Sequence, residues 1–250
     1  MRSAAVLVKD QLTGELLYQK HAEAVVPIAS ITKLMTAMVV LDAERDLHDL
    51  ITIDTADVDR LRYSQSRLPV GARISRNDAL LLALMASDNR SAAALGRTYP
   101  GGLAACVAAM NAKATSLGLS ETRFEDTTGL SSGNVASARD LAGLIDAAYQ
   151  YDLIREFTTT RKAVIHTGRR HLEFQNTNRL LQSARWEIGL SKTGFIGEAG
   201  RCLVMQAYVA NRPLLIVLLD SQGKLTRLGD ANRIKQWLEG SAPAQKARKG

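Results

Sequence analysis

The residues of this 250-residue chain that could do chemistry fall into three short motifs, which are Ser30-Ile-Thr-Lys33, Ser87-Asp88-Asn89 and Lys192-Thr193-Gly194. A serine hydroxyl is a weak nucleophile at neutral pH and needs a base within hydrogen-bond reach. Because positions i and i+3 share one face of a helix, Ser30 and Lys33 would meet if a helix begins at or just before Ser30. Pro27 and the helically spaced apolar residues that follow predict such a start. The first motif therefore indicates a serine that attacks a carbonyl carbon, with a lysine as its base.

The base can accept a proton only when it is neutral. Burial and a neighbouring cation both lower the pKa of a lysine, and Lys192 could be that cation. We therefore expect Lys33 to be buried with a lowered pKa. The backbone N–H of Ser30, at the start of a helix, would form one half of an oxyanion hole, because the N–H groups of a first turn have no intrahelical partner.

The second motif lies between two apolar, helix-like runs, which predicts a connection between helices with polar groups facing a cleft. Ser87 can relay a proton toward the leaving amine there. Asn89 can hold the Lys33 side chain or a substrate amide, because its side chain carries both a donor and an acceptor.

The third motif ends a strand-like run that begins at Trp186. Gly194 has no side chain, so another backbone can approach it closely, and an extended substrate could pair along this strand. The N–H of Phe195 would supply the other half of the oxyanion hole. Lys192 and Thr193 could bind a substrate carboxylate.

Strands predicted at both ends of the chain, with helices between them, imply a sheet assembled from distant segments. A hairpin is expected over Ser3–Lys9 and Glu15–Gln19, and a second over Ala163–Ile165 and His171–Phe174. The other expected elements are helices from about Ser30 to Glu44, Asn77 to Thr98, Gly101 to Leu117, Ser137 to Tyr149 and Leu228 to Leu238, and strands over Trp186–Thr193, Arg201–Ala210 and Leu214–Asp220.

The three motifs, in this order, are those of penicillin-binding proteins and class A β-lactamases. From about Ser3 to Leu238 the chain resembles the low-molecular-mass penicillin-binding proteins, which are serine DD-peptidases of cell-wall peptidoglycan, and it is most similar to their DD-endopeptidase branch. The segments that carry the resemblance are Val26–Ala37, Leu80–Met85, Ala109–Ala114, Thr128–Leu130, Ser137–Leu141, Asn176–Asn178 and Gly200–Met205. One departure is Asp88, where the DD-endopeptidase branch has glutamate.

This resemblance implies an α+β fold, with an antiparallel sheet flanked by helices and a helical subdomain at about 45–180, in a single domain over 1–240. Residues 241–250 are expected to form a flexible basic tail. Ser30 would form the acyl-enzyme with Lys33 as base, and Ser87 and Asn89 would complete the proton and substrate network. Lys192 and Thr193 would anchor the substrate, β-lactams would act as covalent inhibitors, and no cofactor or metal is implied.

In the carboxypeptidase branch an arginine binds substrate, and Arg227 lies near the matching region without a clear motif. That branch also carries a C-terminal β-domain and an amphipathic anchor helix. This sequence ends before either could follow, so we expect no stable membrane anchor. No run is long and apolar enough to span a bilayer. Met1 and Arg2 lead straight into the first expected strand. Because peptidoglycan lies outside the cytoplasm, we expect a periplasmic protein whose export signal has been removed.

Composition is that of an ordinary globular protein, with 46% hydrophobic and 23% charged residues and a net charge of +7. The basic residues are scattered, aromatic residues make up only 5%, and no nucleic-acid-binding motif is present, so nucleic acid is not an expected partner. Cys106 and Cys202 could pair in an oxidising compartment, but two buried free thiols are the favoured interpretation. His166 and His171 flank a turn and are expected to be solvated, because zinc needs three or four ligands.

Two other functions are compatible with the same three motifs. A β-lactamase would need a deacylating base, and Glu125 and Asp126 stand in the appropriate part of the chain, but outside the Glu-x-x-Leu-Asn setting of class A enzymes. We expect these two residues to belong to a loop beside Thr128. A non-catalytic wall-binding sensor is the other alternative, and the intact motifs argue against it. Endopeptidase and carboxypeptidase activities differ in whether a cross-bridging diamino acid or a free D-alanine leaves, which sequence patterns do not reveal.

Overall fold

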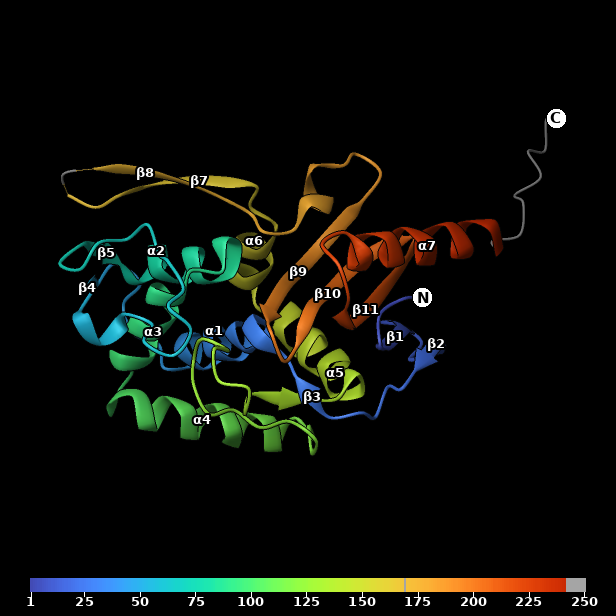
Figure 1. The fold of residues 1–250 in the computed structure, drawn as a ribbon, viewed down its shortest axis with the longest axis horizontal. Helices are drawn as coiled ribbons and strands as arrows, with labels where there is room; N and C mark the ends of the chain where they lie inside the picture. Colours follow the sequence, from blue (N-terminus) through green and yellow to red (C-terminus); the bar gives the residue numbers. More distant parts are fainter. Residues whose placement is uncertain (169, 242–250) are drawn as a thin grey trace.

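The computed structural model describes residues 1–168 and 170–241, and within them the largest sheet has five antiparallel strands in the order β2-β1-β11-β10-β9. Two strands come from the N-terminal hairpin and three from the C-terminal part of the chain, as predicted (Figure 1). The strands are β1 (Ala5–Asp10), β2 (Leu16–Lys20), β9 (Glu187–Ile196), β10 (Gly200–Val209) and β11 (Arg212–Ser221).

Both faces of this sheet are covered, which explains the unbroken apolar run Leu214–Leu219 in β11. Leu215 and Val217 join the large core on the side of helix α5 (Ala138–Tyr149). Ile216 and Leu218 join a smaller core under helix α7 (Thr226–Ser241). Successive side chains of a strand point to opposite faces, so a strand between two helical layers needs apolar residues at every position.

A helical lobe lies beside the sheet and is formed by chain between β2 and β9 (Figure 1). Its helices and helical turns are η1 (Ala29–Ile31), α1 (Thr32–Asp42), η2 (Thr55–Asp57), α2 (Arg76–Leu81), η3 (Leu82–Ala86), α3 (Asn89–Arg97), α4 (Gly102–Ser116), α6 (Asp152–Thr159) and η4 (Arg179–Gln182). Three two-stranded pairs complete it: β3 (Val26–Pro27) with β6 (Val135–Ala136), β4 (Leu50–Thr52) with β5 (Arg73–Ser75), and β7 (Lys162–His166) with β8 (His171–Gln175).

The structure differs from the sequence-based expectations at a few elements. Helix α6 was not predicted, because eight residues are too few to show helical periodicity clearly; it is held by burial of Ile154 and Phe157 against the core. Helix α1 ends at Asp42, since Glu44 adopts a left-handed backbone with φ 49°. Helix α7 begins at Thr226 and includes Ser241, the first residue of the expected tail. Residues 242–250 of that tail lie outside the described residues.

Other expectations concern side chains away from the motifs. Cys106 and Cys202 are buried free thiols, as predicted, and burial raises their pKa to about 12 and about 11, respectively. The rings of His166 and His171 lie edge to face, 4.2 Å apart, at the end of the β7–β8 hairpin. Across the described ranges, no helix has the length and apolar character that a bilayer crossing requires.

Candidate active site

Ser30 lies in the turn η1, immediately before α1, which confirms the predicted helical start. Its neighbour Ala29 has φ 49°, an uncommon value for a residue with a side chain. Two glycines make room for this turn. A Cβ atom on Gly129 would lie 2.0 Å from the Ala29 carbonyl oxygen, and one on Gly194 would lie 2.9 Å from the Ile28 carbonyl oxygen. The Thr128–Leu130 segment and the third motif are therefore packed directly against the nucleophile turn.

The Lys33 side chain is fully buried beside Ser30. Its Nζ donates hydrogen bonds to Ser30 Oγ at 2.8 Å, to Asn89 Oδ1 at 2.7 Å and to the Thr128 carbonyl oxygen at 2.6 Å. Burial lowers the pKa of Lys33 to about 7, although the charges of Asp126 and Asp88 act in the opposite direction. Both features match the expectation for a lysine that acts as a base near neutral pH.

Lys192 is a second buried lysine, and its Nζ donates to the Thr193 carbonyl oxygen at 3.2 Å. Burial first, and then the charges of Lys33 and Arg227, lower the pKa of Lys192 well below its ordinary value. Burial is the largest cause of the lowered pKa of Lys33, as expected, and the charge of Lys33 contributes to the lowered pKa of Lys192.

The second motif occupies the predicted connection between helices. The π-helical turn η3 ends at Ser87, whose backbone is left-handed (φ 58°, ψ 32°). Asp88 then caps α3, with its carboxylate accepting from the Ser91 N–H at 2.8 Å and from Ser66 Oγ at 2.6 Å. Asp88 therefore stabilises the start of α3.

Asn89 and Ser87 face the site from this connection. The Asn89 amide oxygen accepts from Lys33, and its amide nitrogen donates to Ser64 Oγ at 2.8 Å. Ser87 and Asn89 both line a pocket of about 520 Å³. The Ser87 hydroxyl has no hydrogen-bond partner within residues 1–168 and 170–241, so it is available to a ligand.

The third motif lies on β9, which is an edge of the five-stranded sheet, as an extended substrate would require. Thr193 Oγ1 is 2.6 Å from Thr177 Oγ1. The Phe195 side chain is 55% exposed, and the Arg201 guanidinium stacks on its ring at 4.4 Å. Of the predicted residues, Lys33 is thus joined to Ser30 and Asn89 by hydrogen bonds, Gly194 packs against the turn of Ser30, and Ser87 lines the same pocket as Asn89.

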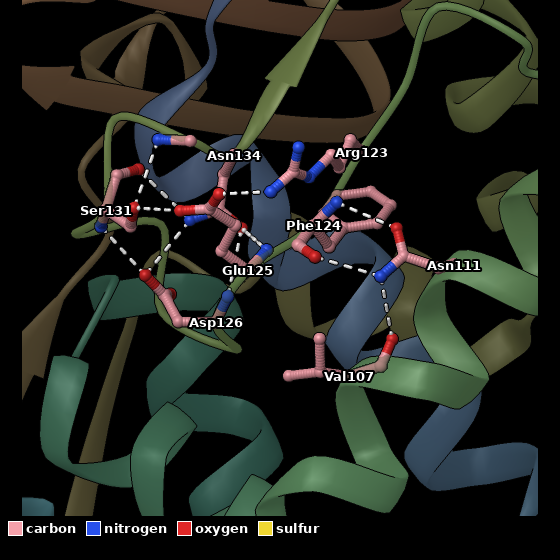
Figure 2. A network of polar contacts seen from close by, with 9 residues as sticks. Val107, Asn111, Arg123, Phe124, Glu125, Asp126, Ser131 and Asn134 are labelled. Atoms are coloured by element: carbon pink, nitrogen blue, oxygen red, sulfur yellow. Dashed lines mark hydrogen bonds and ion pairs between the residues drawn. The ribbon is translucent and has the colours of Figure 1, made fainter.

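The loop that follows Glu125 contains Thr128, whose carbonyl oxygen accepts from Lys33. Figure 2 shows Asp126, Ser131 and Asn134 of this loop. The Asp126 carboxylate accepts from the N–H groups of Thr128, Gly129 and Ser131 and from the Asn134 side chain. Burial would raise the pKa of Asp126, but the hydrogen bonds donated by Ser131 and Thr128 outweigh it and lower the pKa. This carboxylate is committed to holding the loop in shape.

Glu125, the other candidate for a deacylating base, is bound within the same loop. Its carboxylate accepts from Arg123 Nη2 at 2.6 Å and from Ser131 Oγ at 2.8 Å, in the network of Figure 2. The loop interpretation of Glu125 and Asp126 therefore agrees with their contacts.

Sequence reasoning missed several groups that complete the site. The Thr128 carbonyl oxygen accepts from Lys33, and Ser64 Oγ accepts from Asn89. A backbone carbonyl and a serine in an irregular loop have no sequence pattern that would mark them as parts of a site. The segment containing Thr177 was noticed only through the resemblance. Arg227, for which no clear motif was found, donates from Nη1 to the carbonyl oxygens of Gly194 and Cys202, each at 3.0 Å. The structure therefore places Arg227 directly behind the third motif.

Comparison with known proteins finds relatives in both sequence and fold. The chain is 49% identical over 243 residues to a D-alanyl-D-alanine endopeptidase of Pseudomonas aeruginosa, covering 96% of this chain and 78% of that protein. It is 46% identical over 239 residues to the Escherichia coli K12 D-alanyl-D-alanine endopeptidase, covering 95% and 77%. The Streptomyces K15 DD-transpeptidase superimposes with a TM-score of 0.88 at 28% identity, covering 95% of this chain and 97% of that one, which confirms the predicted fold. Since residues 1–223 also match the peptidase S11 family model, described as D-alanyl-D-alanine carboxypeptidase, the chain belongs to this family of serine DD-peptidases.

Proposed function

We propose that this protein is a DD-endopeptidase that hydrolyses D-alanyl cross-links of peptidoglycan through an acyl-enzyme on Ser30. The observation that carries the proposal is the 2.8 Å contact between Ser30 Oγ and the buried Lys33 Nζ, whose pKa is lowered to about 7. A lysine with this pKa is neutral in an appreciable fraction of molecules at neutral pH, so it can accept the serine proton.

In the acylation step, neutral Lys33 takes the proton from Ser30 Oγ as that oxygen forms a bond to the D-alanyl carbonyl carbon. The carbonyl oxygen becomes an oxyanion, which accepts hydrogen bonds from the backbone N–H groups of Ser30 and Phe195. The intermediate then collapses and the C–N bond breaks. Ser87 gives its hydroxyl proton to the leaving amine and takes the proton that Lys33 had received, so Lys33 is neutral again. The product is an ester of Ser30.

In the deacylation step, a water molecule loses a proton to the neutral amine of Lys33 and attacks the ester carbonyl. The C–O bond to Ser30 breaks, the D-alanyl carboxylate leaves, and Ser30 regains its proton. Lys33 thus serves both half-reactions, and the two carboxylates of the Glu125–Asp126 loop are not required.

Substrate binding follows from the open edge of β9. An extended peptide can pair with this strand, while Asn89 binds a substrate amide. Lys192, Thr193 and Arg227 bind the carboxylate next to the scissile bond, and Gly194 lets the peptide approach. These roles rest on the convergence of the side chains around Ser30.

The choice of endopeptidase over carboxypeptidase is supported by the names of the two relatives that are nearly half identical to this chain. The carboxypeptidase alternative is supported by the description of the family model. We further propose that residues 1–240 act as one catalytic domain in the periplasm, because the substrate lies there. Peptidoglycan peptides and, as covalent inhibitors, β-lactams are the proposed partners.

The proposal is tested with labelled penicillin and defined cross-linked muropeptide dimers. Wild-type protein should form a covalent adduct that persists for hours and should cleave the dimer into monomers identified by mass spectrometry. Ser30→Ala should do neither while remaining folded. Adduct formation undiminished in Ser30→Ala would refute the nucleophile, and rapid release of hydrolysed penicillin would favour a β-lactamase. An adduct without dimer cleavage would favour a carboxypeptidase if D-alanine is released from a pentapeptide, and a sensor if it is not.

A further inference from the structure

A second pocket adjoins the active site on the side of the third motif. It has a volume of about 490 Å³ and lies where the start of η4, the start of β10 and the first turn of α7 meet. Its polar lining comes from Thr177, Arg179, Arg201, Lys224 and Arg227. The pocket adjoins the third motif, because its lining residue Thr177 has Oγ1 2.6 Å from Thr193 Oγ1.

The charge of this pocket is entirely positive. Four of its lining residues are cationic, namely Arg179, Arg201, Lys224 and Arg227, and no aspartate or glutamate lines it. None of the four forms an ion pair with a carboxylate in the part of the chain that the structure describes, whereas many other arginines, such as Arg97 with Asp57, do. The start of a 16-residue helix adds the positive end of its dipole.

Two of these cations are held in place by contacts that do not neutralise them. Arg227 donates only to backbone carbonyl oxygens, and Arg201 stacks on the exposed ring of Phe195. Burial and the charge of Arg201 both lower the pKa of Arg227, as is expected for a buried cation that lies beside another cation with no anion near it. A bound carboxylate would relieve this repulsion and use the fixed guanidinium groups as bidentate donors.

The pocket beside Ser87 has a different character. It is lined by Asp88 and Glu173 as well as by Arg67, so its charges are mixed. The two pockets flank the motif residues and would favour different parts of a substrate. An anionic segment is favoured only in the pocket beside Thr193.

We propose that the cationic pocket binds carboxylates on the leaving strand of a peptidoglycan cross-link, and that Arg179, Arg201 and Lys224 thereby select cross-links over free D-alanyl termini. This inference rests on the proposed endopeptidase function. A single D-alanine leaving group carries one carboxylate, which the residues next to Thr193 bind. A leaving stem peptide continues beyond that point and carries additional carboxylates, which reach the second pocket.

The experiment compares the double variant Arg179→Glu/Lys224→Glu with the unmodified enzyme. Both side chains are exposed, so the fold should tolerate the change. The matched control is Arg185→Glu/Lys162→Glu, which alters the net charge equally at exposed positions that do not line the pocket. Three substrates are used: a cross-linked dimer, the same dimer with the leaving-strand carboxylates beyond the scissile residue amidated, and a linear pentapeptide that ends in D-Ala-D-Ala.

The pocket variant should raise KM for the unmodified dimer about tenfold, because two favourable charge contacts become repulsive. Its kinetics on the amidated dimer and the pentapeptide, and its acylation by penicillin, should stay within about twofold of the unmodified enzyme. The control pair should leave all of these unchanged. Equal losses on both dimers, or no loss on either, would overturn this inference and leave the endopeptidase function standing. Failure of the unmodified enzyme to cleave any dimer would overturn both.

Discussion

Asn89 Oδ1 lies 2.7 Å from Lys33 Nζ, and the nitrogen of the same amide lies 2.8 Å from Ser64 Oγ. The side chain thus presents its acceptor to the lysine and its donor to a serine of the neighbouring loop. This bridge ties α1, α3 and the loop before β5 together around the base. Because the bridge is uncharged, it positions Lys33 without favouring its protonated form through an opposite charge.

The first prediction concerns the pH dependence of acylation. Lys33 must be neutral to accept a proton, and its pKa is lowered to about 7. The rate of penicillin acylation should therefore be low at acid pH and rise as the pH increases through about 7. A stopped-flow series with fluorescent penicillin gives the profile. A rate that starts to rise only near the ordinary lysine pKa would contradict this assignment of the base.

Replacing Asn89 with aspartate should move that profile to higher pH. A carboxylate at 2.7 Å from the ammonium group would favour its charged form and raise the pKa of Lys33. The half-maximal rate should shift upward by about 1–3 pH units. The control is Asn211→Asp, at an exposed position in the turn between β10 and β11, which should leave the midpoint unchanged.

Replacing Asp126 with asparagine should have the opposite effect. The charge of Asp126 raises the pKa of Lys33, so its removal should lower the midpoint of the acylation profile, while the asparagine oxygen can still accept hydrogen bonds from the loop. Glu125→Gln removes a charge from the adjacent residue, which is not among the groups that shift Lys33. A shift of equal size in both variants would argue against a direct effect of Asp126.

Burial of the Lys33 side chain should also lower the free energy of unfolding near neutral pH. Lys33 binds its proton more weakly in the folded state than in the unfolded state, so the free energy of unfolding should rise with pH from about 7 toward 10.5. Lys33→Met should therefore stabilise the protein by about 1–4 kcal/mol near pH 7. The gain should shrink as the pH approaches 10.5, where the lysine is neutral in both states.

Urea unfolding of the inactive variant at pH 7 and pH 10 measures this effect. Lys162→Met, at an exposed position of β7, is the control and should change the free energy of unfolding by less than about 0.5 kcal/mol. A Lys33→Met protein that is less stable than wild type at pH 7 would show that the three hydrogen bonds of Lys33 outweigh its burial cost.

Gly194→Ala tests the packing of β9 against the nucleophile turn. The added Cβ would lie 2.9 Å from the Ile28 carbonyl oxygen and 3.1 Å from the Ala29 Cβ, so the strand or the turn must move. Acylation should fall by at least about tenfold, because displacement of reacting groups is costly in rate. Gly197→Ala, in the same hairpin, has no atom within 4 Å of the new Cβ and should retain full activity.

Local patterns in the sequence predicted the parts of the site that depend on spacing within one element. The i to i+3 spacing brought Lys33 to Ser30, and the glycine of the third motif marked a close backbone approach, as the structure confirms. The burial of Lys33 followed from the chemistry that it must perform.

Other parts of the site were beyond those patterns because they depend on how distant segments meet. The Thr128 carbonyl is a backbone atom, which every residue has, so no residue type marks it. The cations of the second pocket come from η4, β10 and the residues around the start of α7, which are brought together by the sheet and the helix above it. The sequence of the π-helical turn before Ser87 has the apolar pattern of an ordinary α-helix, so the turn could not be predicted.

The pairing of β1 with β11 has a consequence for how the protein is made. The first strand hydrogen-bonds to the last one, with Ala5 opposite Leu219, and the N–H groups of Arg2 and Ser3 donate to Asp230 of α7. Strand β1 cannot take its place in the complete sheet until β11 has been synthesised, which slows folding and leaves unpaired strands exposed meanwhile. The turn that carries Ser30 also rests on Gly194 and cannot be assembled earlier. A nascent chain that has not yet reached β9 therefore lacks an assembled nucleophile turn.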